Sequence, residues 1–450
     1  MPATPNDQLR ALLAEARLNG AALARAVNQL ADENGMSLAY GRAAVSQWLR
    51  GSHPRRPVPQ LIAEVLSRRL DRTITPDAAG FGNGRIWTGG PLQYWTDDPL
   101  KQLAVLAPSA SGSHLGLEKL VYSKAALRIP AWAEIAVTAV HDHGGEQKEH
   151  VGRAEVAAVA AMADMFAVSD ALTGAGPVRP AASGYLATPV VDWLHASAGT
   201  RIRPSLYSTA ARLTCLCGYL CFDDELHGAA QRYFHVALAL AAEAGDPTTY
   251  AIGLRVLSMQ ARRLGHHQEA LNLAHAALQT PAPAPPQTQA LLHSEAAVAH
   301  AATGDRAGAQ HHLRTAEVRL ECDSRPRIAV GTYHPADHAQ QQATAHSLLG
   351  ERPTAINDLK DSIRRRSAVE RRARTIALAD LAELQLACGR LDQAIETWHL
   401  FMDNCSTVQC GRVRTALRNM RSSLRSHDGY PPARVLLHRT APTDRPNGGT

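Results

Sequence analysis

The segment Tyr40–Gly51, with the sequence YGRAAVSQWLRG, carries the side chains of this chain that are best suited to recognition chemistry. If the segment is helical, Val45, Trp48 and Leu49 share an apolar face that can pack on a core. The opposite face then presents Arg42, Ser46, Gln47 and Arg50. Glutamine can pair with adenine, and arginine with guanine or phosphate, when a helix lies in the major groove. The segment therefore predicts the recognition helix of a helix-turn-helix.

The residues after this helix extend the prediction, because they are polar or basic and can contact the phosphate backbone. They are Ser52, His53, Arg55 and Arg56. The V-S-x-W-x-x-G pattern resembles repressor-type helix-turn-helix domains, in which the second helix begins about a dozen residues before the V-S pair. Here Leu23-Ala24 lies 22 residues before Val45-Ser46, which predicts a longer second helix or a longer turn. The alternative is a small helical bundle with a solvated arginine face.

Metal, redox and catalytic chemistry have weaker support in the sequence. Three clustered cysteines lie in the apolar stretch LTCLCGYLCF and are expected to be buried thiols; they are Cys215, Cys217 and Cys221. The loop HDHGGEQKEH, residues 141–150, holds several histidines that we expect to be solvated. No phosphate-binding loop, dinucleotide fingerprint or nucleophile elbow is present. We therefore expect neither an enzyme nor a bound metal or cofactor.

The candidate recognition helix must be held by a small helical head. Leucine and valine recur at helical spacing before it, and Pro59–Leu70 reads as a fourth helix with proline at its start. These patterns predict a head over residues 1–80. Residues 81–150 are rich in glycine, proline and serine, yet they contain Trp87, Tyr94 and Trp95. We expect this region to be a partly ordered connection.

A repeated Gly-x4-Ala pattern organises the rest of the chain. Its four copies are Gly265/Ala270, Gly304/Ala309, Gly350/Ala355 and Gly389/Ala394, and a degenerate copy lies at Asp224/Ala229. Each glycine can end one helix in a left-handed conformation, and each alanine allows the next helix to pack closely. Stacked helix pairs of this kind predict a tetratricopeptide-type solenoid over residues 151–426. Residues 427–450 lack periodicity and predict a disordered tail.

Composition agrees with an all-α fold. Hydrophobic residues make up 45% of the 450 residues but aromatic residues only 5%, which favours helices over strands. A net charge of +6 suits a polyanionic partner such as DNA. We find no signal peptide and no run of about 18 apolar residues, so we expect a cytoplasmic, nucleoid-associated protein with no membrane contact.

Two blocks of sequence resemble a family of actinobacterial regulators that join a helix-turn-helix to tetratricopeptide repeats. The first is Tyr40–Gly80, and the second is Asp224–Phe234 with Ala237-Leu238, Gly245-Asp246 and the helix LSMQA at 257–261. This family is associated with the control of differentiation and antibiotic production. The resemblance covers about two-thirds of the chain, closely from residue 40 to about 277 and more loosely thereafter. It implies a regulatory role, with repression as the expected sign.

A helical solenoid has a groove that binds peptides, small molecules or protein partners. We expect the groove to be lined by polar residues of the first helix of each hairpin: Arg212, Tyr250, Arg255, Gln260, His293 and Gln342. The arginine-rich segment between 364 and 374 is interpreted as a solvated helix face. Tight binding to double-stranded DNA needs two heads about one helical turn apart, so we expect a homodimer. The alternative function is a tetratricopeptide scaffold that does not read DNA.

Overall fold

The computed structural model describes seven segments of the chain. They are residues 4–82, 98–107, 117, 120–135, 150–281, 284–321 and 332–440. Trp87, Tyr94 and Trp95, and the histidine-containing loop up to residue 149, lie outside the described residues. Within the described part, the fold is all-α, as expected from the sequence. The strands found there are the two-residue pair β1 (His150–Val151) and β2 (Ser197–Ala198), which run parallel.

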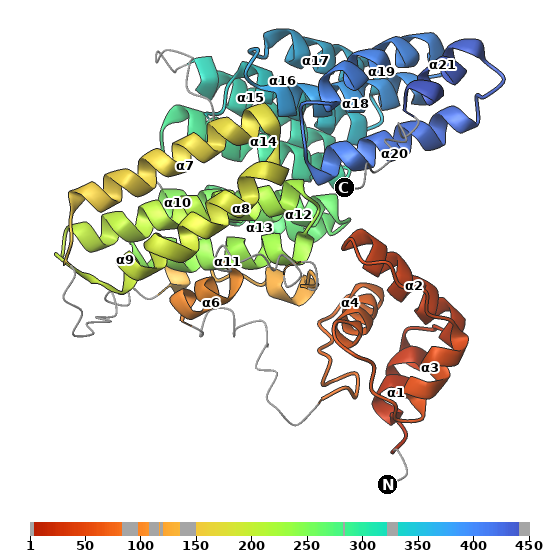
Figure 1. The fold of residues 1–450 in the computed structure, drawn as a ribbon, viewed down its shortest axis with the longest axis horizontal. Helices are drawn as coiled ribbons and strands as arrows, with labels where there is room; N and C mark the ends of the chain where they lie inside the picture. Colours follow the sequence, from red (N-terminus) through yellow and green to blue (C-terminus); the bar gives the residue numbers. More distant parts are fainter. Residues whose placement is uncertain are drawn as a thin grey trace, which may run out of the picture.

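The head is a bundle of four helices with its own core (Figure 1). The helices are α1 (Asp7–Glu15), α2 (Gly20–Glu33), α3 (Arg42–Leu49) and α4 (Val58–Leu70). Asparagine side chains cap the first two helices by accepting backbone N–H groups, which supports the helix starts. The apolar faces that the sequence predicts in this region meet in the core, where Leu9, Leu23, Val27 and Val45 are fully buried.

The remainder of the fold is a solenoid of helical hairpins. It begins with α7 (Arg153–Thr173), α8 (Ala175–Tyr185), the π-helical turn η4 (Leu186–Val190) and α9 (Val191–His195). Five hairpins follow: α10 (Ile202–Asp223) with α11 (His227–Glu243), α12 (Pro247–Arg263) with α13 (His267–Gln279), α14 (Pro286–Ala302) with α15 (Arg306–Glu321), α16 (Pro335–Leu348) with α17 (Arg352–Arg365), and α18 (Arg371–Ala387) with α19 (Leu391–Cys405). The pair α20 (Gly411–Arg425) and α21 (Pro431–Arg439) ends the described chain.

The Gly-x4-Ala pattern has the structural role that the sequence predicts. Gly265, Gly304, Gly350 and Gly389 follow the first helices of four hairpins with φ between +73° and +84°, a region that favours glycine. The four alanines of the pattern are fully buried where the second helix meets the first. In the degenerate copy, Glu225 takes the left-handed conformation with φ +63°, and Ala229 is buried. The helical-hairpin solenoid is thus confirmed.

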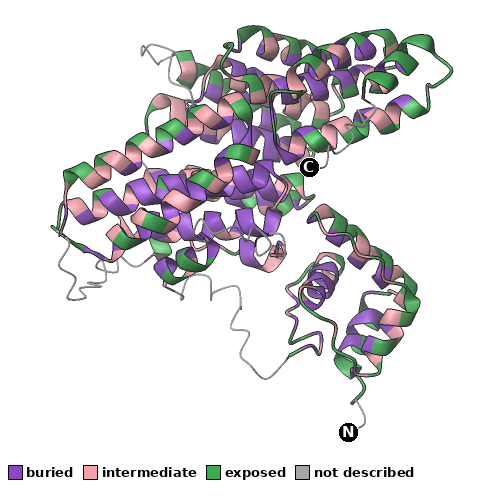
Figure 2. Ribbon diagram, viewed as in Figure 1, coloured by how far each residue is buried: buried purple, intermediate pink, exposed green. Residues whose placement is uncertain are grey.

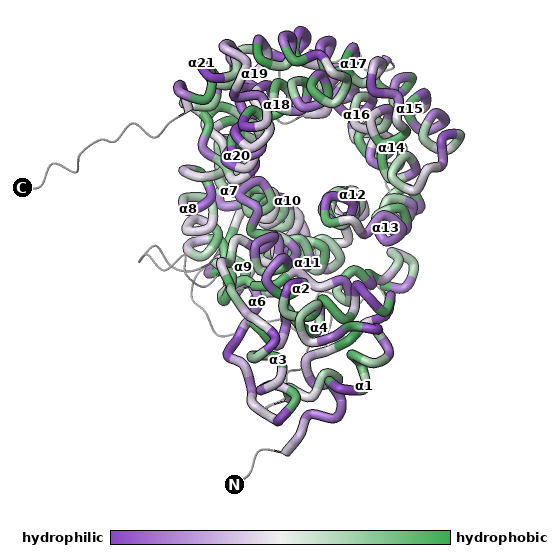
Figure 3. Tube along the Cα trace, turned by 90° about the vertical axis from the view of Figure 1, so that its right-hand side faces the viewer, coloured by the Kyte–Doolittle hydropathy of each residue, from purple (hydrophilic) through white to green (hydrophobic). Residues whose placement is uncertain are grey.

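The solenoid curls until its two ends meet, forming a ring (Figure 3). The N–H of Gln409 donates to the carbonyl of Thr173 at 2.7 Å, and the N–H of Gly176 donates to the carbonyl of Gln409 at 2.8 Å. Gly411 packs so closely on Asp224 that an added Cβ would lie 2.5 Å from the Asp224 backbone. Contacts of α18 with α7 complete the closure. A ring encloses its concave surface, whereas an open solenoid exposes it.

The predicted disordered tail is wrong for residues 427–440. Helix α21 forms there and packs on α19 and α20, with Ala433 and Leu436 fully buried. These two apolar residues are three positions apart and therefore lie on one helix face, a spacing too short to stand out as periodicity in the sequence. Residues 441–450 lie outside the described chain.

The described parts of the connecting region pack on the solenoid. Helix α6 (Pro99–Leu106) and the 3-10 turns η2 (Lys124–Leu127) and η3 (Trp132–Glu134) contact α11 or α12. Tyr233 donates its hydroxyl to the carbonyl of Leu106 at 2.8 Å. As a result α11 is buried on nearly all sides, and Figure 2 shows buried residues concentrated in α10 to α12.

Among the described residues, α7 is the one helix long and apolar enough to cross a membrane. Glu155, Asp164 and Asp170 interrupt α7, so it is not a continuous run of 18 apolar residues, and its many alanines account for its mean hydropathy. In the structure α7 packs beside α8, α10 and α18, and 22% of its most apolar window is buried. One such helix is weak evidence for a membrane span.

Candidate nucleic-acid interface and ring cavity

Helix α3 is anchored in the head by its apolar face, as the sequence predicts. Val45 is fully buried and Trp48 is 4% exposed. The Trp48 ring meets the Tyr40 ring edge to face, with centroids 5.2 Å apart. The side chain of Asn28 on α2 binds both backbone groups of Tyr40, at 2.9 Å each. These contacts fix the start of α3 against α2.

The unusual spacing before Val45-Ser46 arises mainly from the connection between α2 and α3. The segment Asn34–Gly41 separates the two helices, whereas a helix-turn-helix has a turn of about 3–4 residues. Asn34 closes α2 by donating its side-chain amide to the carbonyl of Leu30 at 2.8 Å. The head therefore contains two adjacent helices, α2 and α3, joined by a connection longer than that turn.

The outer face of α3 and the loop after it carry exposed cations. Seven of the eight predicted DNA-binding residues are exposed: Arg42, Gln47, Arg50, Ser52, His53, Arg55 and Arg56. Ser46 is half-buried, and its hydroxyl donates to the carbonyl of Arg42 at 3.1 Å. Within the described chain, none of the four arginines has an ion-pair partner within 4 Å. Their positive charge is therefore available to an anion.

Helix α3 lies on the part of the head that is far from the ring (Figure 3). In Figure 3, α1 and α3 lie at the end of the molecule farthest from the ring, and α4 and α2 lie nearer to it. It is α4 that contacts η2, the 3-10 turn packed on the solenoid.

A polar network joins α4 to the ring. The carboxylate of Glu64 accepts from Arg68 Nε at 3.0 Å and from the backbone N–H of Lys124 at 2.9 Å, and it lies 3.9 Å from His266 Nε2. Lys124 Nζ forms ion pairs with Asp71 of the head and, at 2.7 Å, with Glu269 of the ring. Burial raises the pKa of Glu64 to about 7 and lowers the pKa of His266 to about 4. The junction thus combines the buried polar groups of Glu64 and His266 with the ion pairs of Lys124, which bridge the head and the ring.

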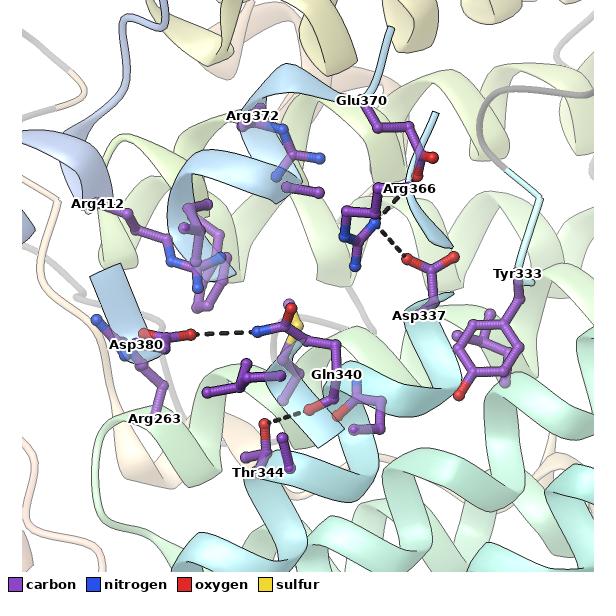
Figure 4. A pocket seen from close by; sticks show the side chains of 18 of the residues that line it. Arg263, Tyr333, Asp337, Gln340, Thr344, Arg366, Glu370, Arg372, Asp380 and Arg412 are labelled. Atoms are coloured by element: carbon purple, nitrogen blue, oxygen red, sulfur yellow. Dashed lines mark hydrogen bonds and ion pairs between the residues drawn. The ribbon is translucent and has the colours of Figure 1, made fainter. Parts of the chain in front are cut away.

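The ring encloses a cavity of about 990 Å³ (Figure 4). Its wall is built mainly from the first helices of the hairpins, together with α7 and α20. Seven arginines line it: Arg255, Arg262, Arg263, Arg352, Arg366, Arg372 and Arg412. A volume of this size is typical of sites that take small molecules or short peptide segments.

Some of these arginines are neutralised by carboxylates. Arg366 pairs with Asp337 at 3.1 Å and with Glu370 at 3.0 Å. Arg372 pairs with Asp170 at 3.1 Å and with Asp223 at 3.3 Å, which links α18 to α7 and α10. The pairs of Arg372 therefore help to hold the ring closed, and both sets of pairs line the cavity.

Two other arginines keep unpaired charge. Arg263 lies on the cavity wall, and no carboxylate of the described chain lies within 4 Å of its guanidinium. Burial within the ring and the nearby Arg412 lower the pKa of Arg263. Arg255 has a buried Nε without a hydrogen-bond acceptor. Asp380, the carboxylate nearest this side of the cavity, accepts from Gln340 at 3.2 Å, and burial raises its pKa. The cavity wall therefore suits a ligand with negative groups.

Of the six residues predicted to line the groove, Arg255 alone lines the cavity. Tyr250 and Gln260 are fully buried between helices, and Arg212 lies on the outside, 3.4 Å from Asp164. His293 contacts α15 instead, and Gln342 is not part of the cavity wall. The reason is helical phase: on α12 the lining positions are 255, 259, 262 and 263, which share one face. Tyr250 and Gln260 lie on other faces of the same helix.

The arginine-rich segment 364–374 does not form one solvated face. Arg364 and Arg365 are exposed and pair with Asp361, in agreement with the expectation. Arg366 and Arg372 turn inward to the carboxylates of the cavity wall. The turn between α17 and α18 divides the segment, so neighbours in sequence point in different directions.

The clustered cysteines are buried, as predicted. Burial raises the pKa of Cys215 and Cys221 to about 12 and raises that of Cys217 further. Thiols that remain protonated at neutral pH are poor nucleophiles and poor metal ligands. They serve as small apolar side chains in the core of α10.

The fold and sites define an all-α protein in which a small helical head with an exposed basic face is joined to a closed ring of helical hairpins. Residues 9–82 match a family model described as the SP15 N-terminal domain. The matched residues coincide with the head core, which extends from Leu9 to Phe81. No curated protein matches the chain.

Proposed function

We propose that the protein is a transcriptional regulator that binds promoter DNA through α3 and senses a ligand in the cavity of its repeat ring. The observation that carries the proposal is the outer face of α3. It combines a buried apolar anchor with exposed arginines and a glutamine, and the arginines have no intramolecular carboxylate partner within the described residues. A solvated face that served only solubility would not need such a fixed helix beneath it.

The electrostatic contribution can be estimated from the free cations. If Arg42, Arg50, Arg55 and Arg56 each neutralise one phosphate, the slope of log K against log salt is roughly −3.6 per head. Two heads on one duplex would double this slope. We therefore propose a homodimer whose heads contact half-sites about 34 Å apart. Repression is the sign that the family resemblance favours.

The turn between α12 and α13 contacts both the cavity and the junction with the head, so it offers a route by which ligand binding can be coupled to the position of the head. Arg262, Arg263 and His267 line the cavity, and His266 and Glu269 contact the junction with α4. An anionic ligand that draws Arg263 inward would act on the turn that carries His266. We propose that ligand binding changes the position of the head through this turn.

The second candidate function is a protein-interaction scaffold with no sequence-specific DNA binding. The long connection Asn34–Gly41 favours it, because it departs from the short turn of established helix-turn-helix domains. The two proposals differ in what α3 contacts. A scaffold would bind its partners unchanged when the outer face of α3 is altered.

The test is selection of duplexes from a random pool by the purified full chain. We expect the wild type to enrich a sequence motif with twofold symmetry. We expect the variant Arg42→Ala/Gln47→Ala/Arg50→Ala to enrich none while keeping the wild-type circular dichroism. Enrichment of the same motif by the folded variant would contradict the proposal, and so would the absence of any motif with the wild type.

A further inference from the structure

Five histidines gather on the helices α13, α14 and α15, away from the cavity wall. They are His275, His293, His300, His311 and His312. Their rings are in mutual contact, with centroids between 5.0 and 5.2 Å apart. Isolated surface histidines do not assemble in this way, and the proposed DNA-binding function makes no use of the group.

Three of them bring one ring nitrogen each to a common point. One ligand atom from each of His275, His300 and His312 lies within 4.8 Å of the other two. The Nε2 atoms of His275 and His300 are 3.0 Å apart. Two nitrogens bound to one tetrahedral zinc ion at about 2.0–2.1 Å each are separated by roughly 3.3 Å, so little movement is needed. We propose that His275, His300 and His312 bind a divalent transition-metal ion of the zinc type.

The surroundings of His300 fit this role. Its Nδ1 lies 2.8 Å from Asp305 Oδ2, while the other oxygen of Asp305 accepts the N–H of Gly308 at 3.0 Å. A carboxylate on the far nitrogen is the usual partner of a metal-binding histidine, because it orients the ring and makes the ligand nitrogen more basic. The carboxylate is itself fixed by the start of α15, so His300 is oriented in advance.

His312 is supported in the same manner. Its Nδ1 lies 3.0 Å from Nδ1 of His293, which leaves Nε2 as the atom free to face an ion. The fourth position is open to water, because the three rings are only half-buried.

A second group of possible ligands does not fit as well. His334, Asp337 and Glu370 also approach one another. However, Arg366 already forms ion pairs with both carboxylates, and a divalent ion there would be repelled by its guanidinium. Among the described residues, no arginine or lysine forms an ion pair with Asp305, the carboxylate of the histidine group, which favours this group as the metal site.

The test is zinc binding by the full chain, produced without a histidine tag and stripped of metal by a chelator. Isothermal titration with Zn²⁺ alone is expected to show one ion per chain in the wild type and a higher Tm with zinc than without. The variants His275→Ala and His300→Ala are expected to lose this binding at least 100-fold. The control His438→Ala, an exposed histidine on α21, is expected to bind zinc like the wild type.

A subtler variant keeps all three rings and tests the supporting carboxylate. Asp305→Asn is expected to fold and to bind zinc about 10–100-fold more weakly, since it removes the charge behind His300. A wild type that takes up no zinc would overturn the proposal. Equal affinities for the wild type and His300→Ala would do so as well, because binding would then occur elsewhere. Neither result bears on the DNA-binding proposal, which depends on α3.

Discussion

The closure of the ring makes a strong prediction about Arg372. Its guanidinium lies 3.1 Å from Asp170, 3.3 Å from Asp223 and 3.2 Å from the Tyr219 hydroxyl. The side chains of Asp170 and Asp223 are 4% and 0% exposed. The substitution Arg372→Leu therefore leaves carboxylates without their shared cation in a site that water barely reaches.

Removing one partner of a buried ion pair typically costs about 3–5 kcal/mol. Arg412 remains 3.3 Å from Asp223 and keeps that carboxylate paired. Asp170 loses its one ion-pair partner within the described chain, so we expect a loss of about 3 kcal/mol, the lower end of the range, at pH 8. Burial raises the pKa of Asp170 to about 6 even with Arg372 present. Protonation therefore relieves the charge in acid, and we expect a smaller loss at pH 5.

The assay is urea unfolding followed by circular dichroism at both pH values, with Arg371→Ala as the control because Arg371 is exposed. The double variant Arg372→Leu/Asp170→Leu is expected to recover much of the stability, since it leaves no unpaired charge. Small-angle scattering should show the ring still closed, because the backbone bonds of Gln409 remain. A loss below about 0.5 kcal/mol at pH 8, or a loss equal at both pH values, would refute the reasoning.

Three further predictions follow from single sites. Trp48→Ala removes the buried anchor of α3 and should destabilise the head by about 3–5 kcal/mol. The measurement is urea unfolding of the full chain with a probe in the head. An unchanged midpoint of unfolding would contradict the burial of Trp48 in the core of the head. Gly228→Leu would drive a Cβ into the carbonyl oxygen of Leu120, so limited proteolysis should cut residues 120–135 faster while the ring resists. An unchanged cleavage rate would contradict the close contact between Gly228 and Leu120. Burial lowers the pKa of His338 to about 4. Between pH 6.5 and 4 the unfolded chain therefore binds a proton that the folded chain does not. The free energy of unfolding consequently falls as the pH falls through this range. His338→Asn should reduce the slope of the free energy of unfolding against pH by up to about 1.4 kcal/mol per pH unit. An identical slope in the variant would argue against the lowered pKa of His338.

Much of the architecture was predictable because local rules produce it. The left-handed glycines and the buried alanines of the repeat follow from steric requirements that act within one hairpin. The anchor of α3 followed from helical spacing in the same way. The short apolar face of α21 fell below the length at which periodicity is recognisable, and its partners α19 and α20 lie earlier in the chain.

The cavity and the histidine group were not predictable, since both depend on how hairpins stack. Polarity alone suggested Tyr250 and Gln260 as groove residues, but the phase of α12 places 255, 259, 262 and 263 on the wall. The role of Arg372 required the closure of the ring, which no local pattern encodes. The one available signal for the histidine group was the recurrence of histidine at 293, 300, 311 and 312 on successive helices.

The most direct test of the central claim is genome-wide immunoprecipitation of the tagged protein in its own cells. The wild type is compared with Arg42→Ala/Gln47→Ala/Arg50→Ala and with the control Arg371→Ala/Gln393→Ala/Arg425→Ala. The control removes the same residue types from exposed positions of the ring. We predict sharp peaks over promoters for the wild type and the control, and their loss in the α3 variant. Peaks that are absent from the wild type, or that persist in the folded α3 variant, would contradict DNA recognition by this helix.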